Sequence, residues 1–207
     1  MGIFLRLYVS QNVTPEEWEQ AYSATLPLIE EFPLMEYRDK TPKGYPMFSG
    51  AKTVERELHH GLGWRTVGDY KSYNTAENHT LYREIPLQGS SEYFDPILLL
   101  GAEQSIIDFH DERIDGKYLE FWGNKTQGEP YHVFLLAIAC YMAEILQDKL
   151  VIGGDITRGQ CKMAVNWLED LLNKKVNLPI QCDCERLYSH YNAPRNLDKK
   201  NDENKLG

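Results

Sequence analysis

The glycine-rich segment Gly153–Gln160, with the sequence GGDITRGQ, has the residue types of an anion site. It follows a short apolar stretch and precedes a helical pattern, and a helix that starts after glycines offers backbone N–H groups to an anion. Arg158 could add a bidentate grip on a phosphate or carboxylate. The candidate anion site comprises five residues, Gly153, Gly154, Asp155, Thr157 and Arg158.

This segment matches neither the dinucleotide-binding glycine fingerprint nor the phosphate-binding P-loop. Two glycines also suit a tight turn, so we favour a structural role over a ligand site. In that interpretation Asp155 bonds nearby backbone, and Gly159 lets the following helix approach a neighbour closely.

Cys161 lies in the first turn of the expected helix, where the helix dipole lowers the pKa of a thiol, and His132 could act as its base. However, Cys161 also opens the apolar stripe of that helix. We therefore expect a buried, inert thiol.

Residue types that bind metals occur in three places: Cys182 and Cys184, His59 and His60, and the segment 108–112. None has the paired spacing that lets one turn hold two tetrahedral ligands. No serine-hydrolase elbow occurs either. We expect no metal and no cofactor, and the sequence favours a non-enzymatic role.

The chain of 207 residues carries a formal net charge of −9. Residues 195–207 hold four basic and three acidic side chains, so the acidic excess lies in the body of the protein. Nucleic acids and anionic membranes select clustered Lys and Arg, which makes them poor partners for this chain. An acidic surface instead favours a basic protein partner.

We therefore predict a soluble, acidic protein-interaction module, with an immunity-protein or antitoxin-type inhibitor as the specific form. The alternative is a small-molecule enzyme or sensor that uses the anion site. The expected partner-binding residues are acids and nearby tyrosines: Glu55, Glu57, Asp69, Tyr70, Tyr73, Asp108, Asp111 and Glu112.

The elements that must position these residues form an α+β single domain in residues 1–193, followed by a disordered polar tail, 194–207. We expect a mixed or mostly antiparallel sheet packed against about three main helices, at about 15–30, 130–147 and 157–173. A short buried strand is predicted at 150–152, since this stretch is too short and apolar to be an exposed edge.

Local signals support these assignments. Thr14/Glu17 and Thr157/Gln160 have capping-box spacing at two of the helix starts. Pro27 predicts a kink or early stop in the first helix, and alternating apolar residues predict an edge strand at 176–180. No signal peptide or bilayer-spanning run is apparent, so we expect a reduced, cytoplasmic protein. The sequence does not indicate an oligomeric state.

Overall fold

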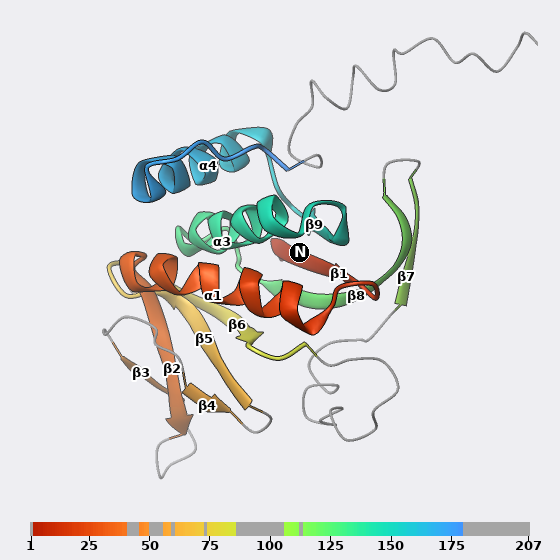
Figure 1. The fold of residues 1–207 in the computed structure, drawn as a ribbon. Helices are drawn as coiled ribbons and strands as arrows, with labels where there is room; N and C mark the ends of the chain where they lie inside the picture. Colours follow the sequence, from red (N-terminus) through yellow and green to blue (C-terminus); the bar gives the residue numbers. More distant parts are fainter. Residues whose placement is uncertain are drawn as a thin grey trace, which may run out of the picture.

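A computed structural model describes residues 2–40, 46–49, 56–58, 61–72, 74–85, 106–111 and 114–179 (Figure 1). For residues 36–40, 46–49, 56–58, 61–62, 106–111 and 114–117, only the backbone is described. The tail predicted at 194–207 lies outside the described residues.

The described strands form two sheets, and every pairing between them is antiparallel. The first, called the β1 sheet, has the order β7-β8-β1-β9. Its strands are β1 (Phe4–Ser10), β7 (Ile106–Asp111), β8 (Ile114–Lys125) and β9 (Leu150–Gly154). The predicted α+β class is confirmed, although the division into two sheets carried no signal in the sequence.

The second sheet, called the β5 sheet, is centred on β5, which pairs with β2, β4 and β6. Strand β3 adds to the outer edge of β2. The strands are β2 (Leu34–Lys40), β3 (Pro46–Ser49), β4 (Arg56–Leu58), β5 (Gly61–Asp69) and β6 (Asn74–Tyr82).

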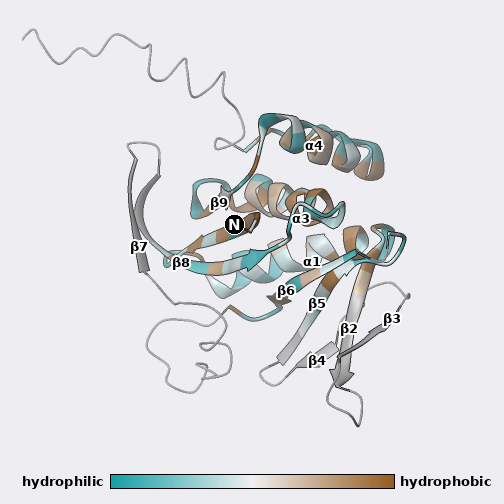
Figure 2. Ribbon diagram, turned by 180° about the vertical axis from the view of Figure 1, so that it is seen from behind, coloured by the Kyte–Doolittle hydropathy of each residue, from teal (hydrophilic) through white to brown (hydrophobic). Residues whose placement is uncertain are grey.

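Three helices were predicted, and the structure has α1 (Pro15–Glu31), α3 (Tyr131–Leu146) and α4 (Arg158–Leu172). Helix α3 lies between α1 and α4, and in Figure 2 the brown, apolar part of the helical layer follows it. This central position explains why α3 buries residues on nearly all sides. One continuous core contains buried side chains from both sheets and all three helices, including Leu7, Trp18, Trp64, Trp122, Leu135 and Leu168.

Two sequence-based expectations about these elements were wrong. The early stop expected near Pro27 does not occur: α1 continues to Glu31, because Leu28 and Ile29 are buried and hold the last turn against the core. The kink, which was the other outcome expected there, stays a prediction. Residues 176–179 form no strand, since the backbone N–H of Val176 donates to Glu169 Oε1 (3.1 Å). By contrast, the buried strand predicted at 150–152 was confirmed: Leu150, Val151 and Ile152 of β9 are all buried, and among the described strands β9 pairs with β1.

The two sheets meet where β6 faces β8, and side chains make this contact instead of a backbone ladder. The indole Nε1 of Trp122 donates to the carbonyl of Thr80 (2.7 Å), and Asn124 Nδ2 donates to the carbonyl of Asn78. Trp18 Nε1, from α1, donates to the next carbonyl in the row, that of Tyr82 (3.0 Å). Alternate carbonyls along this edge are therefore capped by three side-chain donors, which satisfies backbone groups that a sheet edge leaves open.

Candidate functional site

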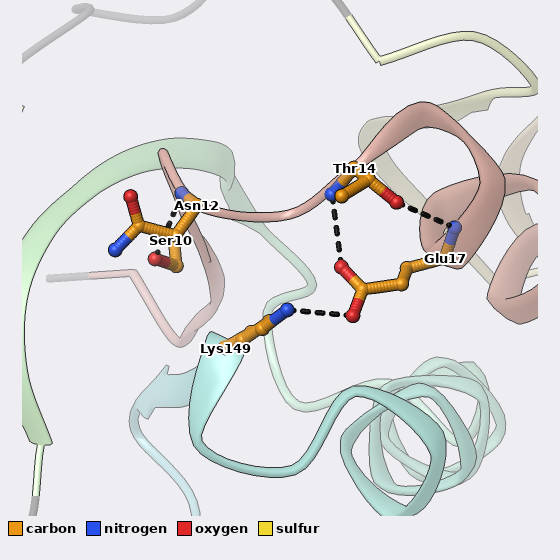
Figure 3. Close-up of polar contacts among 5 residues, drawn as sticks. All are labelled: Ser10, Asn12, Thr14, Glu17 and Lys149. Carbon is orange, nitrogen blue, oxygen red and sulfur yellow. Dashed lines mark hydrogen bonds and ion pairs between the residues drawn. The ribbon is translucent and has the colours of Figure 1, made fainter.

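Helix α1 starts at a rigid capping box (Figure 3). Thr14 Oγ1 accepts a hydrogen bond from the Glu17 backbone N–H (3.2 Å), and Glu17 Oε2 accepts one from the Thr14 N–H (2.9 Å). Just upstream, Ser10 Oγ accepts from the backbone N–H of Asn12 (3.2 Å), in the turn that leaves β1. The predicted capping box is thus confirmed, and it fixes where the helix begins.

The same glutamate also ties α1 to the segment that precedes β9. Lys149 Nζ donates to Glu17 Oε1 at 2.6 Å (Figure 3), and Lys149 belongs to the 3-10 turn η1 (Gln147–Lys149). The hydrogen bond from Lys149 is the main reason why the pKa of Glu17 is lowered, with the Thr14 N–H adding to it. Glu17 therefore serves the fold rather than a partner.

The outward face of α1 is acidic. The helix contains five glutamates and no Lys or Arg. Its inner face buries Trp18, Ala21, Tyr22, Thr25, Leu28 and Ile29. We call the four remaining glutamates, which are all exposed, the α1 acidic face: Glu16, Glu19, Glu30 and Glu31.

Part of this face borders an open hollow of about 420 Å³, lined by Pro15, Glu16, Glu19, Gln20 and Ser23. Glu19 is paired with Arg83, whose Nη2 and Nε lie 2.6 Å and 2.9 Å from Glu19 Oε1. Glu16, Glu30 and Glu31 form no ion pair within the described part of the chain. Their charges therefore remain available to a molecule that approaches α1.

The sequence prediction of partner-binding residues did not include this face. Its signal was present in the spacing of Glu16, Glu19 and Glu30, which repeats on one side of a helix without any intervening basic residue. The prediction selected acids close to tyrosines elsewhere in the chain and did not include α1. The aromatic residues of α1, Trp18 and Tyr22, are buried.

The structure describes only some of the predicted partner-binding residues. Glu55, Tyr73 and Glu112 lie outside the described residues. Glu57 lies on β4 in the β5 sheet, whereas Asp108 and Asp111 lie on β7 in the β1 sheet, with only their backbone described. Their gathering on one surface stays a prediction.

Asp69 was expected on the surface, and this expectation was wrong. Its side chain is only 4% exposed. Its Oδ1 accepts a hydrogen bond from the backbone N–H of Lys71 (2.7 Å), in the turn that follows β5. A carboxylate in an Asx turn of this kind holds the chain reversal and is withdrawn from solvent. The neighbouring Tyr70 is half-buried, and its N–H donates to the carbonyl of Pro33 (3.0 Å).

The candidate anion site binds the end of β9 to the start of β1. The Asp155 N–H donates to the Phe4 carbonyl, and Asp155 Oδ2 accepts the Phe4 N–H, both at 2.9 Å. Gly154 has a φ of +96°, and a Cβ there would lie 2.5 Å from Phe4 O. The backbone role expected for Asp155 is therefore present, but its partner is distant in sequence.

The remaining residues of this segment also serve the fold. Thr157 Oγ1 accepts the Gln160 N–H (3.2 Å), which confirms the second capping box. Arg158 is half-buried and Gly153 packs against the Tyr8 ring. Among the described residues, the atom nearest to a Cβ at Gly159 would be Thr157 Oγ1 at 3.9 Å, so no neighbouring described element approaches this glycine closely. Anion binding here stays a prediction.

Cys161 is disulfide-bonded, whereas the sequence predicted an inert thiol. The predicted burial is correct, since the residue is 0% exposed, but oxidation depends on a spatial neighbour that spacing does not reveal. A disulfide has no thiol to act as a nucleophile, so the pairing with His132 does not apply. Cys140 is the free, buried cysteine of the described chain.

No group of three or more His, Cys, Asp or Glu residues that could hold a metal ion occurs among the described residues. Over the same residues, the helices are all too short or too polar to cross a bilayer. Comparisons with family models, with curated proteins and with solved structures found no match to this chain.

Proposed function

We propose that this chain is a protein-interaction module that binds a basic protein partner, and that the α1 acidic face is its main contact. An immunity-protein or antitoxin-type inhibitor is the specific form of this proposal. The observation that carries it is the presence on one exposed helix face of four glutamates, three of which have no ion pair among the described residues.

The charge of this face suits recognition of a basic surface. The formal net charge of the whole chain is −9. The negative field of α1 therefore adds to that of the rest of the protein and is not cancelled by it. Complementary fields of this kind accelerate encounter and disfavour acidic competitors. The proposal also excludes nucleic acid as the partner, because phosphate backbones would be repelled.

The rigidity of α1 supports the same function. Its start is fixed by the capping box, and its sides are held by the Glu17–Lys149 and Glu19–Arg83 ion pairs. A face that is already ordered loses little conformational entropy when it binds, which favours affinity. Glu16 and Glu19 border an open, shallow depression, so their carboxylates can be reached from solvent by a basic side chain.

We propose a second contact region for the partner, which consists of the partner-binding residues predicted from the sequence without Asp69. They are Glu55, Glu57, Tyr70, Tyr73, Asp108, Asp111 and Glu112. A partner that covers both regions would need a larger interface than α1 alone provides.

The cytoplasmic location predicted from the sequence is also only a proposal. Disulfides persist in oxidising compartments and are rare in the reducing cytosol. The disulfide at Cys161 therefore favours an oxidising location over the cytoplasm.

The test starts with affinity capture from the native cell and identification of the captured protein. The partner is then measured against E16Q/E30Q and against the matched control D148N/D170N, which removes the same charge from exposed positions outside α1. We expect only E16Q/E30Q to lower affinity and association rate, and we expect both effects to shrink at high salt. Equal affinities for the two variants, or a captured partner that is acidic, would contradict the proposal.

A further inference from the structure

Two buried histidines lie in the core beside the contact between the two sheets. His79, on β6, is 0% exposed, and His132, in the first turn of α3, is 1% exposed. The His79 ring meets the Trp122 ring edge to face at 5.7 Å and the Tyr131 ring at 6.2 Å. Strand β6, strand β8 and helix α3 therefore converge on these imidazoles.

Within the described chain, neither histidine has an acceptor already hydrogen-bonded to its second ring nitrogen. His79 Nδ1 lies 3.1 Å from the Glu77 carbonyl, which can only accept, so Nδ1 carries the proton and Nε2 is bare. His132 Nδ1 lies 2.6 Å from Thr126 Oγ1. In both rings Nε2 is buried and has no hydrogen-bond partner in the described chain.

Protonation of either ring would place a positive charge in the core, at a cost in free energy. At His132 the new N–H donor would also lack an acceptor. At His79 the backbones of Glu77 and Asn124 favour the charged ring, but burial is the larger effect. The location adds to this cost for His132, because the N-terminal end of a helix disfavours cations. The two rings are also close enough for a charge on His132 to oppose a charge on His79.

The ionisable groups around the rings do not offset this cost. Glu77 and Lys125 are paired across β6 and β8 at 3.7 Å, so the Glu77 charge is already matched. The other neighbours are Glu129 and Tyr131 at the start of α3, and Asp155 after β9. Burial lowers the pKa of His79 to about 4, and it also lowers the pKa of His132 despite the opposing effect of Asp155. Burial raises the pKa of Tyr131, which keeps this phenol neutral.

His79 lies between the two β6 carbonyls, those of Asn78 and Thr80, that accept hydrogen bonds from β8 side chains. We define the seam as residues 77–80 of β6 and 122–125 of β8. Because these contacts are side-chain hydrogen bonds and not a ladder, the seam can open without breaking either sheet.

We propose that the seam is a pH-sensitive junction, closed while His79 and His132 are neutral and opened when acidification protonates them. The direction follows from proton linkage. In the open state the imidazoles are solvated and have the ordinary histidine pKa of 6.5, whereas in the closed state the pKa of His79 is about 4. Between these two pH values the open state binds more protons than the closed state. The closed seam is therefore fully stable above pH 6.5 and is lost progressively as the pH falls toward 4.

The size of the effect can be stated for His79 alone. With a pKa of about 4 when closed and 6.5 when open, the opening equilibrium constant rises about twentyfold between pH 7 and pH 5. Protonation of His132 would increase this factor.

The first test is an NMR titration of the histidine ring resonances in the wild-type protein, combined with hydrogen exchange at pH 7 and pH 5 corrected for the intrinsic rate. We expect both rings to titrate below pH 6.5, and we expect faster exchange at pH 5 in β6 and β8 but not in α4. Rings that titrate at 6.5 or above in the folded protein would overturn the proposal, as would equal acceleration in α4.

The second test is His79→Phe, which keeps an aromatic ring and removes the titrating group. This variant should lose most of the pH dependence of seam exchange between pH 7 and pH 5, while Glu77 and Lys125 are unchanged. Retention of the wild-type pH dependence would overturn the proposal. If the variant does not fold, the titration of the wild-type rings decides the question.

Discussion

The indole N–H of Trp122 donates to the backbone carbonyl of Thr80 at 2.7 Å, and this bond connects two sheets that share no ladder among the described strands. Trp18 makes the equivalent bond to Tyr82, two residues further along β6. Both indoles are buried. The outer edge of β6 is thus closed by large side chains from another sheet and from a helix.

Trp122→Phe should test how much this connection contributes. The substitution keeps an aromatic ring beside Trp64 and His79 but leaves the Thr80 carbonyl without its donor. We expect the free energy of unfolding, measured with urea, to fall by about 1 kcal/mol, since a half-buried acceptor would lose its hydrogen bond. Trp18→Phe is a parallel variant, which removes the donor to the Tyr82 carbonyl and should also lower the free energy of unfolding. No loss of stability in Trp122→Phe would show that the bond is dispensable.

Gly154→Ala and Gly159→Ala form a matched pair with opposite expected signs. At Gly154, φ is +96° and a Cβ would lie 2.5 Å from Phe4 O, so alanine should lower the free energy of unfolding by about 1–3 kcal/mol. At Gly159, on α4, the nearest atom to a Cβ is 3.9 Å away. Alanine at position 159 should raise the free energy of unfolding by about 0.5–1 kcal/mol, because alanine favours the helical conformation more than glycine does.

Thermal and urea unfolding of both variants would check this pair. A neutral effect at Gly154 would mean that the turn after β9 can relax, and the account of its backbone role would then be wrong.

The sequence was most informative where the structure depends on neighbours along the chain. Thr14 with Glu17, and Thr157 with Gln160, cap helices across three residues, so their spacing alone located the starts of α1 and α4. The alternation of Ile3, Leu5, Leu7 and Val9 likewise indicates a strand with one inward face. Leu5, Leu7 and Val9 are buried, whereas Ile3, which precedes β1, is 38% exposed.

Features that depend on distant partners were not predictable in this way. Thr80 and Trp122 are separated by 42 positions, and the Asp155 carboxylate bonds a backbone N–H 151 positions away. Nothing local in Asp69 distinguishes a buried Asx turn from an exposed acid. The α1 acidic face, by contrast, could have been found from the sequence, because glutamate spacing on a helix is a local pattern.

Peptide mapping under non-reducing conditions should find Cys161 in a disulfide and Cys140 as a free thiol. The other two cysteines of the chain are Cys182 and Cys184, both outside the described residues, and we expect one of them in the cross-linked peptide. Reduction should lower the free energy of unfolding by about 2–4 kcal/mol, since the loop constraint on the unfolded chain is removed.

Cys140→Ala is the control for that measurement. It should leave the disulfide and its sensitivity to reductant intact, although loss of a buried sulfur will lower stability in both redox states. If Cys161 alkylates readily in the folded, unreduced protein, the disulfide assignment is incorrect.

Inorganic phosphate should not stabilise this protein at the Gly153–Arg158 segment. An anion there would face the Asp155 carboxylate, which is held in place by the Phe4 N–H, and the Gln160 N–H is already bonded to Thr157. We expect the thermal unfolding midpoint of the wild type to rise no more with sodium phosphate than with sodium chloride at equal ionic strength. The unfolding midpoint of Arg158→Ala should likewise rise no more with sodium phosphate than with sodium chloride. A phosphate-specific rise that Arg158→Ala abolishes would instead support the small-molecule alternative, because a ligand that binds only the folded state raises its stability.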